Sequence, residues 1–256
     1  MRYYVVADTH SYYDELIKAL TEKGFFEDKE SHKLIVCGDL FDRGDQSAEL
    51  QQFIVELMRK DEVILIRGNH EDLMLELLDR AYYYFNTGIE WSHHRSNGTV
   101  KTLYDLTQVS FYLNPYQTVV DKMRSTPYIK DIIPKMLDYY ETDHYVFVHG
   151  WIPSIALRGI GYKYLPINGW RKASAEQWGN ARWINGMDAW SQGVKVEGKT
   201  VVCGHYHASW GHSKLEGKCE EFGEDADFTP FYGDGIIAID ACTAVSGKVN
   251  CIVVED

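Results

Sequence analysis

The chain has 256 residues, 45% of them hydrophobic, and its formal net charge is −12. This length and composition are sufficient for a packed globular core and argue against disorder. The acidic balance, without any Lys/Arg-rich run, argues against binding to duplex nucleic acid, whose phosphate backbone attracts basic surfaces.

The five cysteines are odd in number and show no paired short spacing, which argues against a disulfide framework. The first residues run directly into a strand-like segment and do not resemble a secretion signal. No apolar stretch approaches the roughly 20 residues that a membrane helix needs. We therefore expect a reduced, cytoplasmic protein without a membrane-spanning segment.

Along the chain, short runs rich in Val, Ile, Leu and Tyr lead into polar residues that can bind metal ions. Runs of this kind are typical of buried strands. They cover 3–7, 34–38, 63–66, 145–148 and 201–204, and they lead to Asp8, Asp39, Asn69, His149 and His205. Helical patterns at 14–21 and 46–60 separate the first three runs. The alternation predicts an α/β architecture in which the strand ends gather polar side chains at one edge.

The remaining segments carry fewer chemical signals. The stretch from about 72 to 142 is rich in Tyr and Phe and has no obvious metal ligand. We predict that it is a helical insertion within a single domain of residues 1–256, with its aromatic side chains mostly in a core. Two further strand-like runs, 235–240 and 248–254, close the chain, and we expect them to form a hairpin-like pair.

Two early motifs combine carboxylates with a basic group. Asp8 and His10 are two residues apart, so on an extended segment both side chains would face the same side. The segment from Gly38 to Gly44 holds Asp39, Asp42 and Arg43 after an apolar run. Asp39 is placed to bridge two cations, and the planar fork of an arginine fits phosphate oxygens.

Later motifs add an amide and several imidazoles. Asn69 can offer a neutral oxygen to a metal ion, whereas its neighbour His70 would point elsewhere and remain free to transfer protons. His149, His205 and His207 follow in the second half of the chain. A mixed Asp, His and Asn ligand set without thiolates suits Mn, Fe, Zn or Co. Two such ions can activate water and hold both oxygens of a phosphoryl displacement.

The motifs Asp-x-His, Gly-Asp-x-x-Asp-Arg-Gly, Gly-Asn-His-Glu, His-Gly and Gly-His-x-His occur in this order between residues 8 and 207. In this order they resemble the calcineurin-like metallophosphoesterases. The Asp-Arg-Gly and Asn-His-Glu endings resemble the PPP-type branch, particularly bacterial and phage serine/threonine phosphatases and diadenosine tetraphosphatases. The resemblance implies a four-layer α/β sandwich, in which helices flank two mixed β-sheets. It also implies hydrolysis by a metal-bound hydroxide without a covalent phosphoenzyme.

The resemblance further assigns a cofactor and its ligands. It implies two divalent metal ions, for which we expect Mn, with Fe, Zn, Co and Ni as alternatives. Asp39 would bridge the two ions. The first ion would be bound by Asp8, His10 and His207, and the second by Asn69, His149 and His205.

The resemblance assigns catalytic and phosphate-binding roles as well. His70 would give a proton to the leaving oxygen, with Asp42 as its carboxylate partner, and Arg43 would bind the phosphate. We expect the second phosphate-binding arginine at Arg182, with Arg158 and Arg171 as alternatives.

Two positions depart from the family pattern. Ser11 stands where the family often has Gly after the Asp-x-His histidine, and Trp151 stands where PPP enzymes usually have a second Gly after His-Gly. The change at Trp151 would reshape the floor of the pocket. It therefore weakens any transfer of a substrate from the family to this chain.

Three functions remain as hypotheses. The first is hydrolysis of phosphomonoesters, including phosphoserine or phosphothreonine in proteins. The second is hydrolysis of diadenosine polyphosphates or another small nucleotide, and the third is a non-catalytic scaffold. The set of His70, Asp42 and Arg43 argues against a scaffold, which would not need it. We expect a phosphorylated protein or a small phosphoester as the partner, and neither duplex nucleic acid nor a membrane.

Overall fold

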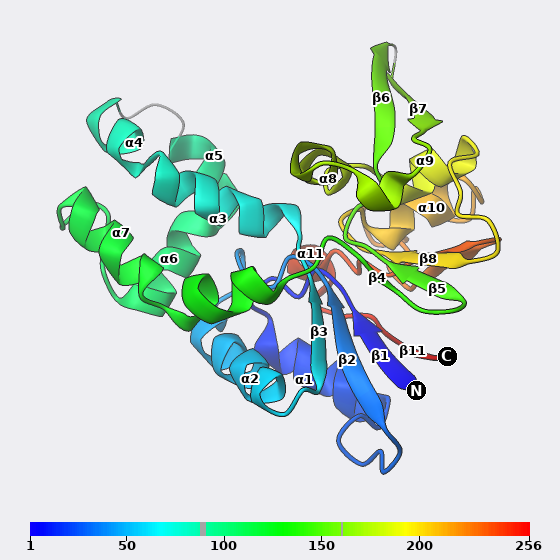
Figure 1. The fold of residues 1–256 in the computed structure, drawn as a ribbon, viewed down its shortest axis with the longest axis horizontal. Helices are drawn as coiled ribbons and strands as arrows, with labels where there is room; N and C mark the ends of the chain where they lie inside the picture. Colours follow the sequence, from blue (N-terminus) through cyan, green and yellow to red (C-terminus); the bar gives the residue numbers. More distant parts are fainter. Residues whose placement is uncertain (88–90, 160) are drawn as a thin grey trace.

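The first β-sheet of the computed structural model contains both the first and the last strand of the chain (Figure 1). The structure describes residues 1–87, 91–159 and 161–256. The strand order is β11-β1-β2-β3, with β1, β2 and β3 parallel and β11 antiparallel to β1. The strands are β1 (Arg2–Val6), β2 (His32–Cys37), β3 (Val63–Ile66) and β11 (Cys251–Glu255).

The second sheet has the order β4-β5-β8-β10-β9, with β5, β8 and β10 parallel and both edge strands antiparallel to their neighbours. Its strands are β4 (Tyr140–Glu141), β5 (Tyr145–Phe147), β8 (Thr200–Cys203), β9 (Phe231–Gly233) and β10 (Ile236–Ala238). Both sheets are therefore mixed. The predicted architecture of two mixed sheets flanked by helices is confirmed.

Alternation along the strands explains how the sheets stack. In β1, Tyr4 and Val6 pack against helices, whereas Tyr3 and Val5 belong to a separate cluster between the sheets. Phe147 of the second sheet is buried in that same cluster. Each sheet thus presents one apolar face to the other sheet and one to helices, which gives four layers.

Helices from the first half of the chain cover the outer face of the first sheet (Figure 1). Helices α3 to α7 extend beyond the sheet as a lobe, called the α3–α7 lobe below. The segment 72–142, which was predicted to be helical, consists mostly of helices where the structure describes it, and strand β4 lies at its end. Its boundary as an insertion stays a prediction. The helices are α1 (Tyr13–Glu22), α2 (Ser47–Arg59), α3 (Asn69–Asp79), α4 (Ala81–Thr87), α5 (Trp91–Ser96), α6 (Thr99–Thr107), α7 (Tyr116–Arg124), η1 (Tyr128–Ile132) and η2 (Ile133–Lys135).

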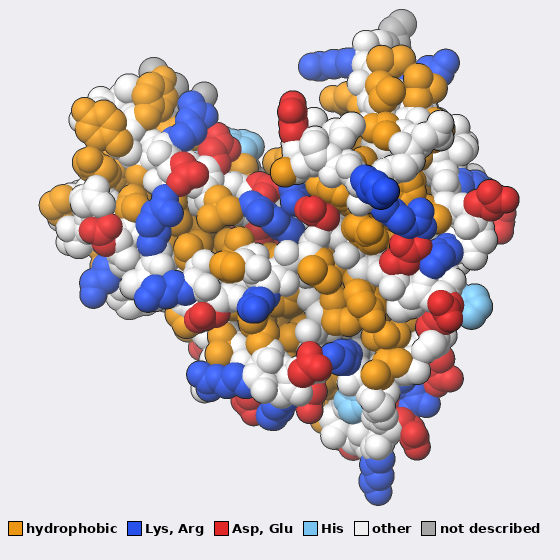
Figure 2. Space-filling model, viewed as in Figure 1, with side chains coloured by type: hydrophobic (Ala, Val, Ile, Leu, Met, Phe, Trp, Pro, Cys, Tyr) orange, Lys and Arg blue, Asp and Glu red, His pale blue; other side chains and the backbone are white. Residues whose placement is uncertain are grey.

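Later helices pack on the outer face of the second sheet. They are η3 (Trp170–Lys172), α8 (Ala175–Ala181), α9 (Gly186–Ser191) and α10 (Ala208–Lys214). A two-stranded ribbon of β6 (Ser154–Gly159) and β7 (Gly161–Pro166) projects from this half, and the surface is hollowed between it and the α3–α7 lobe (Figures 1 and 2). In the described part of the chain, no helix combines the length and apolarity that crossing a membrane requires.

The prediction of a C-terminal hairpin was wrong. β10 pairs with β8 and β9 in the second sheet, whereas β11 pairs with β1 in the first. The short helix α11 (Thr243–Ser246) connects the two strands. The two runs are close in sequence but belong to opposite layers, so the chain end ties the two sheets together.

Candidate active site

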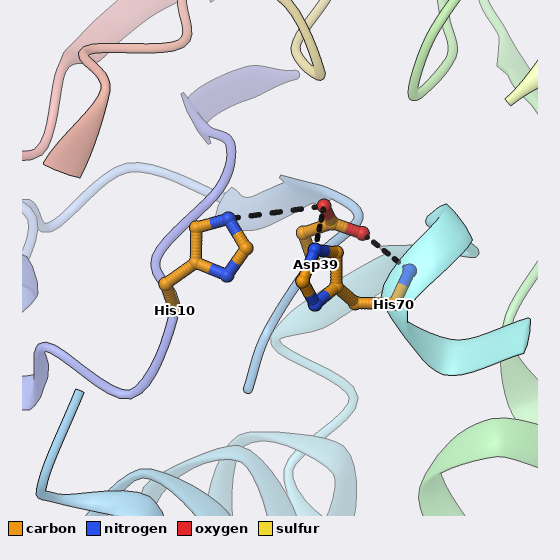
Figure 3. Close-up of side chains that lie close together, drawn as sticks. All are labelled: His10, Asp39 and His70. Carbon is orange, nitrogen blue, oxygen red and sulfur yellow. Dashed lines mark hydrogen bonds and ion pairs between the residues drawn. The ribbon is translucent and has the colours of Figure 1, made fainter. Parts of the chain in front are cut away.

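Asp39 lies at the centre of a cluster of buried side chains that follow the strands of both sheets. Its carboxylate is 3.8 Å from Nε2 of His10, 3.8 Å from Nε2 of His70 and 3.4 Å from Nε2 of His149. Figure 3 shows the imidazoles of His10 and His70 near the same carboxylate oxygen of Asp39, Oδ2, whereas Oδ1 accepts the His70 backbone N–H at 3.0 Å. Within the described chain, two groups could hold a metal ion, and both contain Asp39: His10–Asp39–His70 and Asp39–His149–His205.

Backbone carbonyls fix the orientation of two of these imidazoles. Nδ1 of His10 bonds the Phe41 carbonyl at 2.9 Å, and Nδ1 of His149 bonds the Cys37 carbonyl at 2.8 Å. A carbonyl oxygen can only accept, so each Nδ1 carries the hydrogen. The Nε2 lone pairs therefore face the Asp39 side of the site, in the tautomer that metal-binding histidines usually adopt.

Two further predicted ligands contact this cluster. Oδ1 of Asn69 is 2.7 Å from Nε2 of His149, and Oδ2 of Asp8 accepts the backbone N–H of His205 at 2.9 Å. Both side chains are buried. The structure therefore brings Asp8, Asn69 and His205 together with the Asp39 cluster.

Electrostatics favour a cationic occupant for this site. Burial lowers the pKa of His10 and His149, and burial with the nearby His149 lowers that of His205 to about 3, so these imidazoles are neutral. Burial raises the pKa of Asp8, whereas at Asp39 burial is outweighed by the nearby imidazoles of His149, His70 and His10, which lower the pKa. Buried carboxylates beside neutral imidazoles are costly unless a cation is present, and neutral His with ionised Asp is the state that metal ions bind. The donor set fits two divalent cations.

The backbone at the site is strained in a consistent way. Among the described residues, ten that are not glycine have a positive φ, and six of these are predicted site residues. They are Asp8, His10, Asp39, Asp42, Arg43 and His205. Such conformations persist where the surrounding structure enforces them, and they concentrate at functional sites. The expected extended course of Asp8 to His10 is thus wrong, because both residues adopt left-handed values.

Glu71 holds two turns of the site together. Its buried carboxylate accepts the backbone N–H groups of Gly68 at 2.7 Å, Leu40 at 3.1 Å and Asp39 at 3.2 Å. Gly68 is required here, because a Cβ at this position would meet the Asp39 carboxylate. Glu71 thereby fixes the turn after β2 against the start of α3.

His70 has a partner at each ring nitrogen. Nδ1 lies 2.7 Å from Oδ2 of Asp42, and Nη2 of Arg43 lies 3.2 Å from Nε2. Burial alone would lower the pKa of His70, but the carboxylates of Asp39 and Asp42 outweigh it and raise the pKa above 6.5. Arg43 is exposed, so its guanidinium group lies at the mouth of the site.

Two predicted site residues have other partners. Nε2 of His207 lies 3.1 Å from Glu221, and His207 is absent from both groups around Asp39. Arg182 donates to Asp72 at 2.9 Å and to Asp138 at 2.6 Å, so carboxylates occupy both ends of its guanidinium group. Among its competitors, Arg171 pairs with Glu141 and Arg158 lies on the projecting β6 strand.

Sequence reasoning missed two residues at this site. Asp240 is buried near Asp8, and burial raises its pKa to about 6. Asp240 directly follows an apolar run, as Asp8 and Asp39 do, and this pattern could have identified Asp240 as a site residue. Trp183 is 49% exposed, and its ring lies 5.8 Å from that of His205. No motif marks this tryptophan.

Comparisons with known proteins agree with the geometry. Residues 1–229 match the protein family described as "Calcineurin-like phosphoesterase". The asymmetrical bis(5'-nucleosyl)-tetraphosphatase PrpE of Bacillus velezensis is 38% identical over 77 residues, which are 27% of this chain and 30% of that protein. The symmetrical bis(5'-nucleosyl)-tetraphosphatase of Buchnera aphidicola is 38% identical over 71 residues, which are 28% of this chain and 24% of that protein. The matches thus span less than a third of these relatives.

A solved structure resembles the whole chain. The cold-active protein-tyrosine phosphatase of a psychrophilic Shewanella species aligns with a TM-score of 0.53. The alignment covers 100% of this chain and 75% of that one, at 15% sequence identity. At this identity the likeness establishes a shared fold.

Proposed function

The chain belongs to the calcineurin-like phosphoesterase family, and from this premise we propose that it is a metal-dependent enzyme that hydrolyses phosphate esters. One observation carries the proposal. Asp39 is shared by two groups of metal-binding side chains, and His70, which pairs with Asp42, lies against it. A scaffold would need the metal ligands but would have no use for the His70–Asp42 pair.

We propose the predicted residues as metal ligands. His207 differs from the others, because its side chain pairs with Glu221 and is absent from both groups around Asp39. Two divalent ions, for which we propose Mn, would polarise the phosphate and lower the pKa of the attacking water. The residues that would hold them are Asp8, His10, Asp39, Asn69, His149 and His205. A role for His207 would require its side chain to exchange Glu221 for the metal ion.

The remaining residues act on the substrate. Arg43 lies at the mouth and offers donors to the phosphate oxygens. Hydrolysis joins a water oxygen to phosphorus and breaks the bond to the leaving oxygen, which takes up a proton. His70, once protonated, would supply that proton from Nε2 while Asp42 holds Nδ1, which requires the Arg43 guanidinium to leave Nε2 for the phosphate.

We propose a phosphomonoester as the substrate, with phosphorylated proteins included. A second candidate is a dinucleoside polyphosphate, and it is supported by the two tetraphosphatases at 38% identity. Exposed Trp183 beside His205 could stack on an aromatic or nucleobase group of either substrate. We propose a cytoplasmic location, which is supported by the free thiols of all five cysteines.

A side-by-side assay tests the function. Manganese-loaded protein is given p-nitrophenyl phosphate, serine- and threonine-phosphorylated peptides, and diadenosine tetraphosphate. Preferred turnover of the peptides supports a protein phosphatase, and preferred turnover of diadenosine tetraphosphate supports the second candidate. Failure to hydrolyse any of them, with two bound ions confirmed by metal analysis, would contradict the proposal.

A further inference from the structure

Helix α6 begins directly over the turn that carries Asp42 and Arg43. The Thr99 hydroxyl donates to Oδ2 of Asp42 at 2.9 Å, and the Asp42 backbone N–H donates to the Thr102 hydroxyl at 2.9 Å. Both threonines are buried. Gly98, with φ +89°, permits this approach, since a Cβ there would meet the Arg43 backbone nitrogen.

The Thr99 hydroxyl is not used by its own helix. The Thr99 hydroxyl donates to Asp42, whereas a capping side chain would accept a backbone N–H of the helix, so this bond is not a helix cap. Its acceptor is the same oxygen, Oδ2 of Asp42, that binds Nδ1 of His70. The three side chains therefore form one buried chain from Thr99 through Asp42 to His70.

A second donor on this oxygen has a physical consequence. The terminal torsion of an aspartate side chain is broad, so one hydrogen bond leaves the carboxylate free to rotate. Thr99 and His70 together fix the rotation, while Thr102 fixes the backbone of the same residue. Preorganised orientation matters here because proton transfer needs the donor within hydrogen-bond reach of the leaving oxygen.

We propose that Thr99 is a positioning residue, which holds the Asp42 carboxylate so that Asp42 orients His70 toward the leaving oxygen. The inference rests on the proposed function for its catalytic meaning. It also gives the α3–α7 lobe a role in the reaction, since α6 belongs to that lobe. A shift of α6 on substrate binding would reach His70 through a single side chain.

A leaving-group series tests the proposal. Thr99→Val removes the donor with little change in volume. We expect kcat for phenyl phosphate to fall about tenfold or more, because a poor leaving group needs the proton. We expect kcat for 2,4-dinitrophenyl phosphate to change less than about twofold, since this leaving group departs unprotonated, and KM to stay constant. Thr99→Ser, which restores the donor, should recover the wild-type values.

A matched control lies on the same helix. The Thr107 hydroxyl donates to the Leu103 carbonyl at 2.7 Å, within α6, so Thr107→Val tests the loss of a hydroxyl without loss of the Asp42 contact. We expect Thr107→Val to leave kcat for both substrates unchanged. The proposal would be overturned if Thr99→Val lowered kcat equally for both substrates, or if it left kcat for phenyl phosphate unchanged.

A spectroscopic measurement separates this proposal from the proposed function. In zinc-loaded protein, the Nδ1 proton of His70 should give a low-field NMR signal, which His70→Asn identifies by its loss. We expect Thr99→Val to broaden or shift this signal and Thr99→Ser to retain it. An unchanged signal in Thr99→Val would refute the positioning role whether or not the protein hydrolyses any ester. An inactive wild type with a Thr99-dependent signal would refute only the proposed function.

Discussion

Asp39 is the single carboxylate common to both groups of metal-binding side chains. Asp39→Asn would keep the size of the side chain but remove its charge, so the site would hold its ions less tightly. We expect activity to fall at least about a hundredfold, together with a loss of bound metal. Asp45→Asn is a matched control, because Asp45 is exposed in the same loop and pairs with Lys101 at 3.0 Å, away from the cluster around Asp39. Full activity and full metal content in Asp39→Asn would contradict the shared-carboxylate arrangement.

His70 is expected to affect turnover rather than metal content. Both of its ring nitrogens have partners, Asp42 and Arg43, so His70→Asn should leave the ions in place. We expect kcat to fall by about 10² to 10⁴, the usual contribution of a general acid. Metal analysis of the same preparation is the necessary companion measurement. A large loss of metal would instead make His70 a ligand, which the group His10–Asp39–His70 also permits.

Asp28 gives a prediction about acid stability. Its carboxylate bonds Arg2 at 2.8 Å and the Tyr4 hydroxyl at 2.7 Å, and these bonds lower its pKa from 3.8 to about 2. A lowered folded-state pKa stabilises the protein above pH 3.8, and the stabilisation is lost as the pH falls toward 2. Asp28→Asn should therefore lower Tm above about pH 4, and the difference from wild type should shrink toward pH 2. A difference that is constant across this range would argue against the ionised carboxylate.

At this scale, the sequence located several residues that follow a strand, but it gave no information about which distant residues a side chain pairs with. Asp8, Asp39 and His149 each end an apolar run, so the pattern located them. Arg182 was harder to place, because its guanidinium group is held by Asp72 and Asp138, far away in sequence. No local pattern encodes that choice of partner, nor the pairing of His207 with Glu221.

At the scale of elements, α8 offers a test of local stability. Ser174 accepts the Gln177 backbone N–H at 3.2 Å, and the Gln177 side chain accepts the Ser174 N–H at 2.8 Å, which forms a capping box. Ser174→Ala should lower the free energy of unfolding by about 1 kcal/mol, and Ser174→Asn should recover most of it. Urea unfolding measures both. No loss in Ser174→Ala would mean that packing of Trp178, and not the cap, holds the helix.

The positions of the strands were easier to predict from the sequence than the pairing of one strand with another. Apolar runs of the right length identified β1, β2, β3, β5 and β8, because strand formation depends on local pattern. Pairing depends on tertiary structure, so β10 and β11 were wrongly placed in one hairpin. The β6–β7 ribbon was not foreseen, since most of its side chains are exposed and give no burial pattern.

At the scale of the whole molecule, the site joins the two sheets. Asp8, His10 and Asp39 follow strands of the first sheet, whereas His149 and His205 follow strands of the second. The cluster between the sheets includes Val5, Ile35 and Phe147, and it also contains Ala7 and Cys37, which shortly precede Asp8 and Asp39 in the chain. Four layers could be predicted only through the resemblance to a family, because periodicity in one chain does not tell which sheet a strand joins.

Bound ions would therefore act as a link between the two halves of the fold. Ligands that bind only the folded state stabilise it by RT ln(1 + [L]/Kd), or about 4 kcal/mol for one ion at a thousandfold excess over Kd. For a chain of this size, we expect chelation to lower Tm by about 8 °C or more, and addition of Mn to restore it. Phe147→Ala, which weakens the cluster between the sheets, should make the protein depend more strongly on metal for folding. If chelation removes the ions but leaves Tm unchanged, then the ions do not link the sheets, and the apolar cluster alone holds the two halves together.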